Sequence, residues 1–171
     1  MGFPPPDRVY ERLEVVPDDY FKHLDIAACF PDKQAPLEVD LGCGDGTFLL
    51  EMARQFPDRN FLGVERLLGR VRKVCRKAER GGLQNLRVLR LESSYTIGWL
   101  LPEACVSRLH LLFPDPWPKK RHHKNRFVNH ANVTSMARVL VGSGEFLFKT
   151  DHPGYFEWAS EVMAHATEFR R

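Results

Sequence analysis

The chain has 171 residues and a net charge of +3, with 43% hydrophobic and 27% charged residues. This is long enough to bury a core within one domain, and the composition is that of a globular protein rather than a disordered one. No apolar run reaches the roughly 18 residues of a membrane span. The four cysteines have neither C-x-x-C pairing nor metal-ligand spacing. We therefore expect a cytoplasmic protein with reduced thiols, no metal and no membrane partner.

Residues 1–36 are predicted to form an N-terminal arm with a short helix, which Asp18 or Asp19 caps and which runs to Ala28. Residues 37–171 are predicted to form the core of the same single domain. Its expected strands, from their apolar runs, are 37–41, 60–64, 86–91, 106–113 and 145–149. Its expected helices are one directly after a glycine loop at 42–46, then 67–80, 127–140 and 154–165, with a turn at 142–144.

Five alternating strands and helices predict an α/β fold, a Rossmann-like, doubly wound and mostly parallel sheet. Such sheets bind ligands beyond the carboxyl ends of their strands. Acidic residues or the glycine loop fall at or near these ends. The candidates are Glu38 with Gly42, Gly44 and Gly46, then Glu65, then Glu92 with Ser93, then Asp115, and finally Asp151 after Thr150. We expect these residues to share one ligand site.

The glycine loop departs from the dinucleotide fingerprint G-x-G-x-x-G, because Thr47 occupies the position of the last glycine. Glu65, at the end of the second predicted strand, suits a grip on ribose hydroxyls. Acidic residues in or next to the loop make it a poor cradle for pyrophosphate but suit a ligand with sulfonium and ammonium groups. These residues are Glu38, Asp40 and Asp45. The loop therefore favours S-adenosylmethionine over NAD.

The segment 111–126 reads LLFPDPWPKKRHHKNR and combines an acid, an aromatic ring and a cluster of cations. Its three prolines make the backbone around Asp115 stiff. Trp117 suits stacking on a nucleobase, although packing under the loop is an equal alternative. The cations that we expect to bind phosphates are Lys119, Lys120, Arg121, Lys124 and Arg126. Such binding is sensitive to salt and carries little base specificity.

The segments LEVDLGCGDGTFLLEMA, FLGVER, LLFPDPWPKKRHHKNR and FKTD resemble, in this order, the bacterial tRNA (guanine-N7-)-methyltransferase family. The resemblance covers about residues 37–165. It implies a class I methyltransferase fold, S-adenosylmethionine as the cofactor, tRNA as the partner and methyl transfer to N7 of the variable-loop guanine. It also implies site residues, namely Glu38, Glu65, Glu92 and Ser93 for the cofactor, Asp115 between cofactor and substrate, and Lys119 and Asp151 for the substrate.

The sequence departs from the family pattern in two places. The third predicted strand ends in Glu92-Ser93, where the family has Asp-Ala. The family also continues to a T-x-F-E motif and further strands, whereas this sequence ends at Arg171, so we expect a fold that is shortened at its C-terminus.

The chemistry implied by the resemblance needs no strong base, because guanine N7 has a lone pair and no proton. We therefore expect Asp115 to orient the base and to stabilise its developing positive charge.

Other functions are compatible with the same residues. A non-catalytic or truncated RNA-binding protein would keep the fold and the basic segment. An NAD-dependent oxidoreductase would share the sheet, and a methyltransferase for amino groups of protein or DNA would share a D-P-x-W loop related to D-P-P-Y. The chain is expected to be a monomer or a homodimer.

Overall fold

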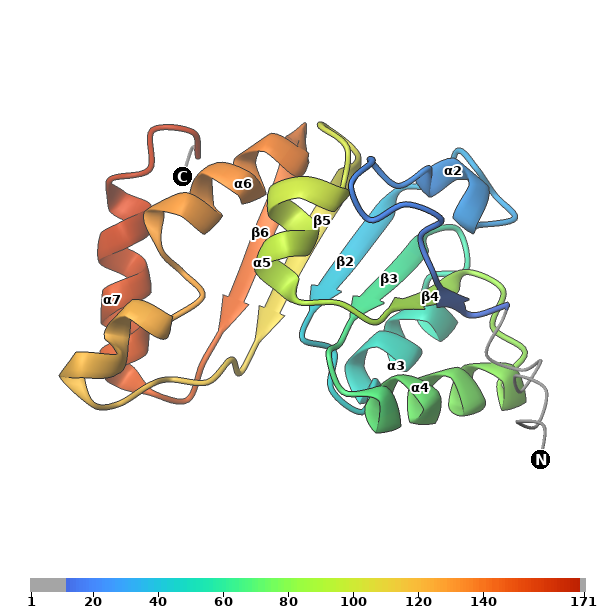
Figure 1. Ribbon diagram of the computed structural model, residues 1–171, viewed down its shortest axis with the longest axis horizontal. Coiled ribbons are helices and arrows are strands. Elements are labelled where there is room, and N and C mark those ends of the chain that lie inside the picture. The colour runs from blue at the N-terminus through green and yellow to red at the C-terminus, as the bar shows by residue number, and fades with distance from the viewer. Residues whose placement is uncertain (1–11, 170–171) are drawn as a thin grey trace.

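The computed structural model describes residues 12–169. Six parallel strands form one sheet in the order β1–β4–β3–β2–β5–β6 (Figure 1). The strands are β1 Glu14–Val15, β2 Leu37–Leu41, β3 Asn60–Val64, β4 Leu86–Leu89, β5 Val106–Leu112 and β6 Leu140–Lys149. The predicted doubly wound parallel sheet is confirmed.

Helices connect the strands and cover both faces of the sheet. They are α2 Ile26–Cys29, α3 Thr47–Gln55, α4 Leu68–Arg80, α5 Ser93–Tyr95, α6 His130–Val139 and α7 Pro153–Ala164. A π-helix, η1 Thr96–Leu100, continues α5, and a 3₁₀ helix, η2 Lys120–Asn125, follows β5. Figure 1 shows α3 and α4 near β3 and β4, and α6 and α7 near β6.

Two separate hydrophobic clusters fill the two faces of the sheet. On one face, which we call the α3 face, Leu49 of α3 and Val74 of α4 join Phe61 of β3 in one cluster. On the opposite face, which we call the α7 face, Met136 of α6 and Tyr155 of α7 belong to the second cluster. The strand residues in this cluster point to the α7 face. Every residue of β2 and β3 is buried, as expected for central parallel strands that are covered on both sides.

The α3 face is open over β5 and β6. Among residues 12–169, the cluster on this face includes no residue of either strand. Along β6, Phe146 and Phe148 pack against the cluster of the α7 face, whereas Glu145, Leu147 and Lys149 are exposed. Since side chains alternate between faces along a strand, the α3 face of this part of the sheet carries polar and accessible side chains.

The N-terminal helix is not where the sequence predicted it. The helix spans only Ile26–Cys29, and the carboxylate of Asp25 caps it by accepting a hydrogen bond from the Ala28 amide at 3.1 Å. Asp19 instead accepts from the Phe21 amide in a turn. The prediction of a cap at Asp18 or Asp19 is therefore wrong, because a local turn uses the Asp19 side chain.

The predicted turn at residues 142–144 is also wrong, because these residues belong to β6. Leu140 pairs with Val106, and the register shifts between Val106 and Arg108. This irregularity lets β6 begin before its two glycines and still align with the rest of β5. The sequence also gave no indication of β1, whose two residues pair with the outer edge of β4.

The four cysteines are free thiols, as predicted. Burial raises the pKa of Cys75 to about 12 and that of Cys105 to about 11. Among the helices of residues 12–169, none has the length and apolar character needed to span a bilayer.

Candidate active site

The carboxyl ends of five strands lie along one edge of the sheet in the order β4, β3, β2, β5 and β6. β3 and β4 continue from β2 in one direction and β5 and β6 lie on its other side, so the switch point is between β2 and β5. The residues that follow these strands are, in spatial order, Glu92 with Ser93, Glu65, the glycine loop, Asp115 and Asp151. The fold therefore brings these predicted site residues to one edge.

The glycine loop adopts a backbone that favours glycine at three positions. The φ angles of Gly42, Gly44 and Gly46 are 78°, 57° and 76°. An added Cβ at Gly46 would lie 2.6 Å from Cγ2 of Val74, whereas at Gly42 no heavy atom lies within 4 Å. Gly46 thus allows α3 to pack against α4, and the space in front of Gly42 leaves the loop backbone accessible to a ligand.

A cavity of about 660 Å³ lies at the switch point between the glycine loop, α3 and the ends of β5 and β6. Its lining combines apolar side chains with a few polar ones, as in many small-molecule sites. The lining residues used below are Asp40, Phe48, Arg108, His110, Phe113 and Lys149.

Asp40 is the carboxylate that lines this cavity from β2. It pairs with His110 across the β2–β5 ladder and is 3% exposed. Burial raises the pKa of Asp40 to about 6, and attraction to His110 opposes the rise. A cationic group of a ligand would stabilise the ionised form of this carboxylate.

Glu38, two residues before Asp40 on β2, is engaged in buried ion pairs. It is 0% exposed, and its carboxylate lies 2.7 Å from Nε2 of His110 and 2.5 Å from a guanidinium nitrogen of Arg59. Of these two acids of β2, Asp40 lines the cavity and Glu38 does not. A direct cofactor contact from Glu38 therefore stays a prediction, and in this structure its carboxylate is engaged by His110 and Arg59.

The carboxylates after β3 and β4 are held by backbone amides. Oε1 of Glu65 accepts a hydrogen bond from the Leu67 amide at 2.8 Å, and Oε2 lies 3.5 Å from Arg70. The two oxygens of Glu92 accept from the Ser94 and Tyr95 amides at 2.9 and 2.8 Å, which makes Glu92 the N-cap of α5. Both carboxylates therefore have fixed positions at the edge of the sheet.

Asp45 is fixed at the start of α3. Its carboxylate accepts a hydrogen bond from the Thr47 hydroxyl at 2.8 Å and forms ion pairs with Lys73 and Lys77. These contacts hold the pKa of Asp45 well below its usual range. Lys73 and Lys77 of α4 are thus directed toward the glycine loop.

The loop after β5 is strained on both sides of Asp115. Phe113 and Trp117 have φ angles of 51° and 45°, which side chains rarely adopt and which are concentrated at functional sites. The Phe113 amide donates to the carbonyl of Lys149 at 2.8 Å, so the loop starts beside the end of β6. Within residues 12–169, the exposed carboxylates of Asp115 and Asp151 have no hydrogen bond or ion pair. Both are free to contact a ligand.

The basic segment that follows is divided between surface and interior. The exposed cations are Lys119, Lys120, Arg121 and Lys124, on η2 or at its cap. Arg126 is 2% exposed and donates hydrogen bonds to two backbone carbonyls. The prediction that Arg126 binds phosphate is therefore wrong, since its guanidinium lies inside the protein.

Asp40 was named from the sequence among the acids around the loop, but His110 and Phe113 were not predicted as site residues. Both line the cavity, and Phe113 is 62% exposed at its edge despite its size and apolar character. The strand pattern contains a signal for His110, because it is a polar residue within the apolar run of β5. Phe113 has a weaker signal, as the last residue before the P-D-P sequence.

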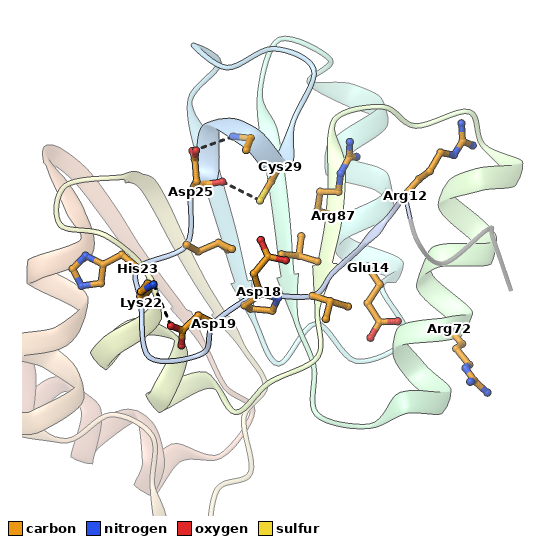
Figure 2. A pocket seen from close by; sticks show the side chains of 15 residues that line it. Arg12, Glu14, Asp18, Asp19, Lys22, His23, Asp25, Cys29, Arg72 and Arg87 are labelled. Carbon is orange, nitrogen blue, oxygen red and sulfur yellow. Dashed lines mark hydrogen bonds and ion pairs between the residues drawn. The ribbon is translucent and has the colours of Figure 1, made fainter. Parts of the chain in front are cut away.

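A second cavity of about 870 Å³ lies beside β1 and α2 (Figure 2). Acidic and basic side chains surround it together, among them Asp18, Asp25, Arg12 and Arg87. Among the described residues that line this cavity, none belongs to the glycine loop or to the acids at the carboxyl ends of β3 to β6. We therefore place the active site at the switch point, although the cavity there is smaller.

Comparison with protein families gives a match over most of the chain. The family described as "Putative methyltransferase" matches residues 34–171. The tRNA (guanine-N(7)-)-methyltransferase of Zymomonas mobilis is 40% identical over 158 residues, which cover 92% of this chain and 66% of the relative. The enzyme of the same name from a Chelativorans species is 39% identical over 134 residues, which cover 78% of this chain and 57% of the relative. The chain thus spans between about half and two thirds of the length of these relatives.

Solved structures with a similar fold are also methyltransferases. The 16S rRNA methyltransferase KamB has a TM-score of 0.60 at 24% identity, with 80% of this chain and 74% of that chain covered. An O-methyltransferase from Thermotoga maritima has a TM-score of 0.59 at 16% identity, with 81% and 47% covered. These similarities show that the fold is the Rossmann-like fold of class I methyltransferases.

Proposed function

This chain belongs to the family described as "Putative methyltransferase". We propose that it transfers a methyl group from S-adenosylmethionine to N7 of the variable-loop guanine of tRNA. The names of the relatives support the reaction and the substrate. The observation that carries the proposal is the position of Asp115. Its unpaired carboxylate stands on a strained loop that leads from Phe113, which lines the cavity, to four exposed cations.

The residues around the glycine loop fit the cofactor. Asp40 is a buried carboxylate at the cavity wall, and among the three acids that the sequence offered for the cationic ligand we assign to it the contact with the ammonium group. The open backbone of the loop suits close approach of the amino-acid part, and Glu65 suits the ribose hydroxyls. Glu92 and Ser93 lie next along the edge and are assigned to the adenine end. Bound S-adenosylmethionine supplies an electrophilic methyl group on a sulfonium sulfur.

Asp115 then orients the guanine and stabilises charge, because the reaction needs no proton removed from N7. Its carboxylate can accept hydrogen bonds from the N1 and N2 groups of guanine, which fixes the direction of N7. Methylation makes the base cationic, so a nearby carboxylate favours the transition state. Phe113, exposed at the same loop, offers its ring to the base.

The exposed cations of the 119–124 segment would position the tRNA through its phosphates. Lys119, Lys120, Arg121 and Lys124 all point to solvent from one short helix and its cap, and such contacts bind without base specificity. Asp151, which follows the end of the neighbouring strand β6, is assigned to the substrate as well. We also propose that residues 1–171 act as one domain, in the cytoplasm, as a monomer or homodimer.

The test is methyl transfer to unmodified tRNA with methyl-labelled S-adenosylmethionine, followed by cleavage at 7-methylguanine to locate the label. Asp115→Asn should lower the rate by about 100-fold or more and leave cofactor affinity within a few-fold. Asp58→Asn is the matched control, because Asp58 is an exposed aspartate just before β3, at the opposite edge of the sheet.

Equal rates for wild type and Asp115→Asn would contradict the role of Asp115. If the wild-type chain binds S-adenosylmethionine and tRNA but transfers no methyl group, the second candidate is favoured, a non-catalytic RNA-binding protein with this fold. This second candidate is favoured by one observation, that the chain covers only part of the length of its relatives. If NADH binds in place of S-adenosylmethionine, both candidates fail.

A further inference from the structure

Arg126 is a buried cation that connects two segments of the proposed active site. Its Nε donates to the carbonyl of Pro116 at 2.9 Å, and a terminal nitrogen donates to the carbonyl of Gly154 at 3.1 Å. Pro116 directly follows Asp115, and Gly154 lies three residues after Asp151 in the first turn of α7. One guanidinium therefore bridges the two chain segments that carry the free carboxylates.

The surroundings of Arg126 fix its side chain rather than offer it to a ligand. The guanidinium carbon lies 5.0 Å from the ring centre of Tyr155 and 5.5 Å from that of Trp158. The backbone of Val128 holds both rings, because its amide donates to the Tyr155 hydroxyl at 3.2 Å and its carbonyl accepts from Trp158 at 2.8 Å. Within residues 12–169, Arg126 forms no salt bridge. Two carbonyls and two rings thus hold its charge.

The loop that Arg126 contacts needs such anchors. It contains two residues in the left-handed region, Phe113 and Trp117, and a backbone of this kind persists only where its surroundings determine it. The Phe113 amide anchors the start of the loop to the end of β6. The bond from Arg126 to Pro116 anchors it again on the far side of Asp115. The carboxylate therefore stands between two fixed points.

We propose that Arg126 is a positioning residue, which sets the place of the Asp115 carboxylate relative to Asp151 and the start of α7. This inference rests on the proposed methyl transfer. Arginine suits this task and lysine does not, because a planar guanidinium can donate in two directions while its faces contact rings. The bonds to Pro116 and Gly154 come from two different nitrogens of one rigid plane, and the single nitrogen of a lysine ammonium does not reproduce that arrangement.

The experiment compares wild type with Arg126→Met, Arg126→Lys and a matched control, Arg138→Met. Arg138 also donates to two carbonyls, those of Ile97 and Leu101, but it lies away from the loop. Steady-state kinetics are measured on folded protein at a temperature well below each unfolding midpoint. Arg126→Met should lower kcat by about 100-fold, the size of effect expected from a misplaced catalytic group, while KM for tRNA changes less than about threefold. Arg126→Lys should not restore kcat, and Arg138→Met should keep it.

A phosphate-binding role for Arg126 predicts the opposite changes in KM and kcat. In that case KM for tRNA rises, the salt dependence of binding decreases and kcat is kept, which would overturn the proposal. Equal kcat values for Arg126→Met and Arg138→Met would overturn it too, because the two variants would then share a general loss of stability.

A second readout keeps the inference testable if the wild-type chain transfers no methyl group. The protein contains three tryptophans, so 5-fluorotryptophan labelling gives three fluorine signals that single Trp→Phe variants assign. In Arg126→Met the Trp117 signal should broaden or split, while the Trp99 signal remains as in wild type. A single sharp Trp117 signal in Arg126→Met would show that the loop keeps its position without Arg126. Failure of the proposed function alone would leave the fluorine result unchanged.

Discussion

The imidazole of His110 and the carboxylate of Glu38 lie 2.7 Å apart, and neither side chain is more than 3% exposed. Glu38 also pairs with Arg59 and, at 3.5 Å, with Arg108, so the buried carboxylate contacts three potential cations. We expect Glu38→Gln to lower the free energy of unfolding by about 3 kcal/mol, because removal of one partner leaves the others uncompensated. Glu145→Gln is the control, since its exposed pair with Arg108 should contribute about 1 kcal/mol at most.

Denaturant unfolding at several pH values checks this role of Glu38. Burial would raise the pKa of Glu38, but the hydrogen bonds from His110 and Arg59 outweigh it and lower the pKa below the ordinary 4.5. A lowered carboxyl pKa stabilises the protein above the unfolded value, and the stabilisation is lost as the pH falls through the folded value. The difference between wild type and Glu38→Gln should therefore be full at pH 7 and shrink in acid below about pH 4.5. A difference that is independent of pH would contradict the ion-pair explanation.

Asp40 should have the opposite effect on stability. Its pKa rises from 3.8 to about 6 on folding. The contribution of Asp40 to the free energy of unfolding is therefore full below pH 3.8. It is lost as the pH rises through about 6, because the folded protein must then bury a charged carboxylate. We expect Asp40→Asn to increase the free energy of unfolding at pH 7.5 by up to about 3 kcal/mol and to have little effect near pH 3.5. Asp58→Asn, an exposed control, should change neither value, and a destabilised Asp40→Asn at pH 7.5 would show that Asp40 makes other essential contacts.

The same carboxylate should give cofactor binding a pH dependence. If the ammonium group of S-adenosylmethionine lies beside ionised Asp40, affinity should fall as the pH drops below about 6, by at most about tenfold per pH unit. Calorimetric titration of the cofactor between pH 5 and pH 8 measures this. Asp40→Asn should bind the cofactor weakly, with an affinity that does not change between pH 5 and pH 8. A wild-type affinity that is also constant over this pH range would contradict a contact between Asp40 and the cofactor.

Gly46 should tolerate no side chain. In Gly46→Ala the new Cβ would lie 2.6 Å from a methyl group of Val74, and the backbone would keep a φ of 76°. We expect a loss of about 2–4 kcal/mol from the clash and the backbone strain together. Gly142→Ala is a matched control in exposed β6, with no heavy atom within 4 Å of the added Cβ, and should stay within about 0.5 kcal/mol of wild type. Thermal unfolding separates the two, and equal midpoints would show that α4 can move away from the loop.

The surface cations of η2 should determine the salt dependence of tRNA binding. Replacing Lys120 and Arg121 with Met removes two expected phosphate contacts, so the slope of log affinity against log salt should become shallower by about one per residue. Binding is measured from 50 to 300 mM KCl. Arg126→Met should keep the wild-type slope because Arg126 is buried. If the slope becomes shallower in Arg126→Met and stays as in wild type in the double variant, the assignment of phosphate contacts is contradicted.

The central strands could be predicted because each is a short apolar run that is buried on both faces. Residues 37–41 and 60–64 were expected as strands, and the structure contains strands with these bounds. β1 could not be predicted in the same way, since two residues contain no periodicity and the pairing with β4 depends on the backbone alone. At residues 142–144 the glycines indicated a turn, and only the shifted register with β5 shows why they extend the strand.

The gathering of the candidate residues at one edge was predictable, but the surroundings of each residue were not. Parallel topology alone places strand ends at one edge, so Glu65, Glu92 and Asp115 could be expected there from the sequence. Glu38 and Asp40 lie two positions apart on the same side of β2, so only their depth in the structure distinguishes a core ion pair from a cavity residue. Arg126 stands among other cations in the sequence, and its burial follows from η2, which ends at Asn125 and turns the chain inward.

The ten-residue β6 pairs with β5 along one side, and among residues 12–169 no strand covers its other side. Its outer row of peptide groups can therefore accept another strand, and Leu147 adds an exposed apolar side chain there. Glu145 and Lys149 flank this leucine on the same face. Stacking of a second copy on this face would take both charged groups out of water, so Glu145 and Lys149 oppose association through the leucine.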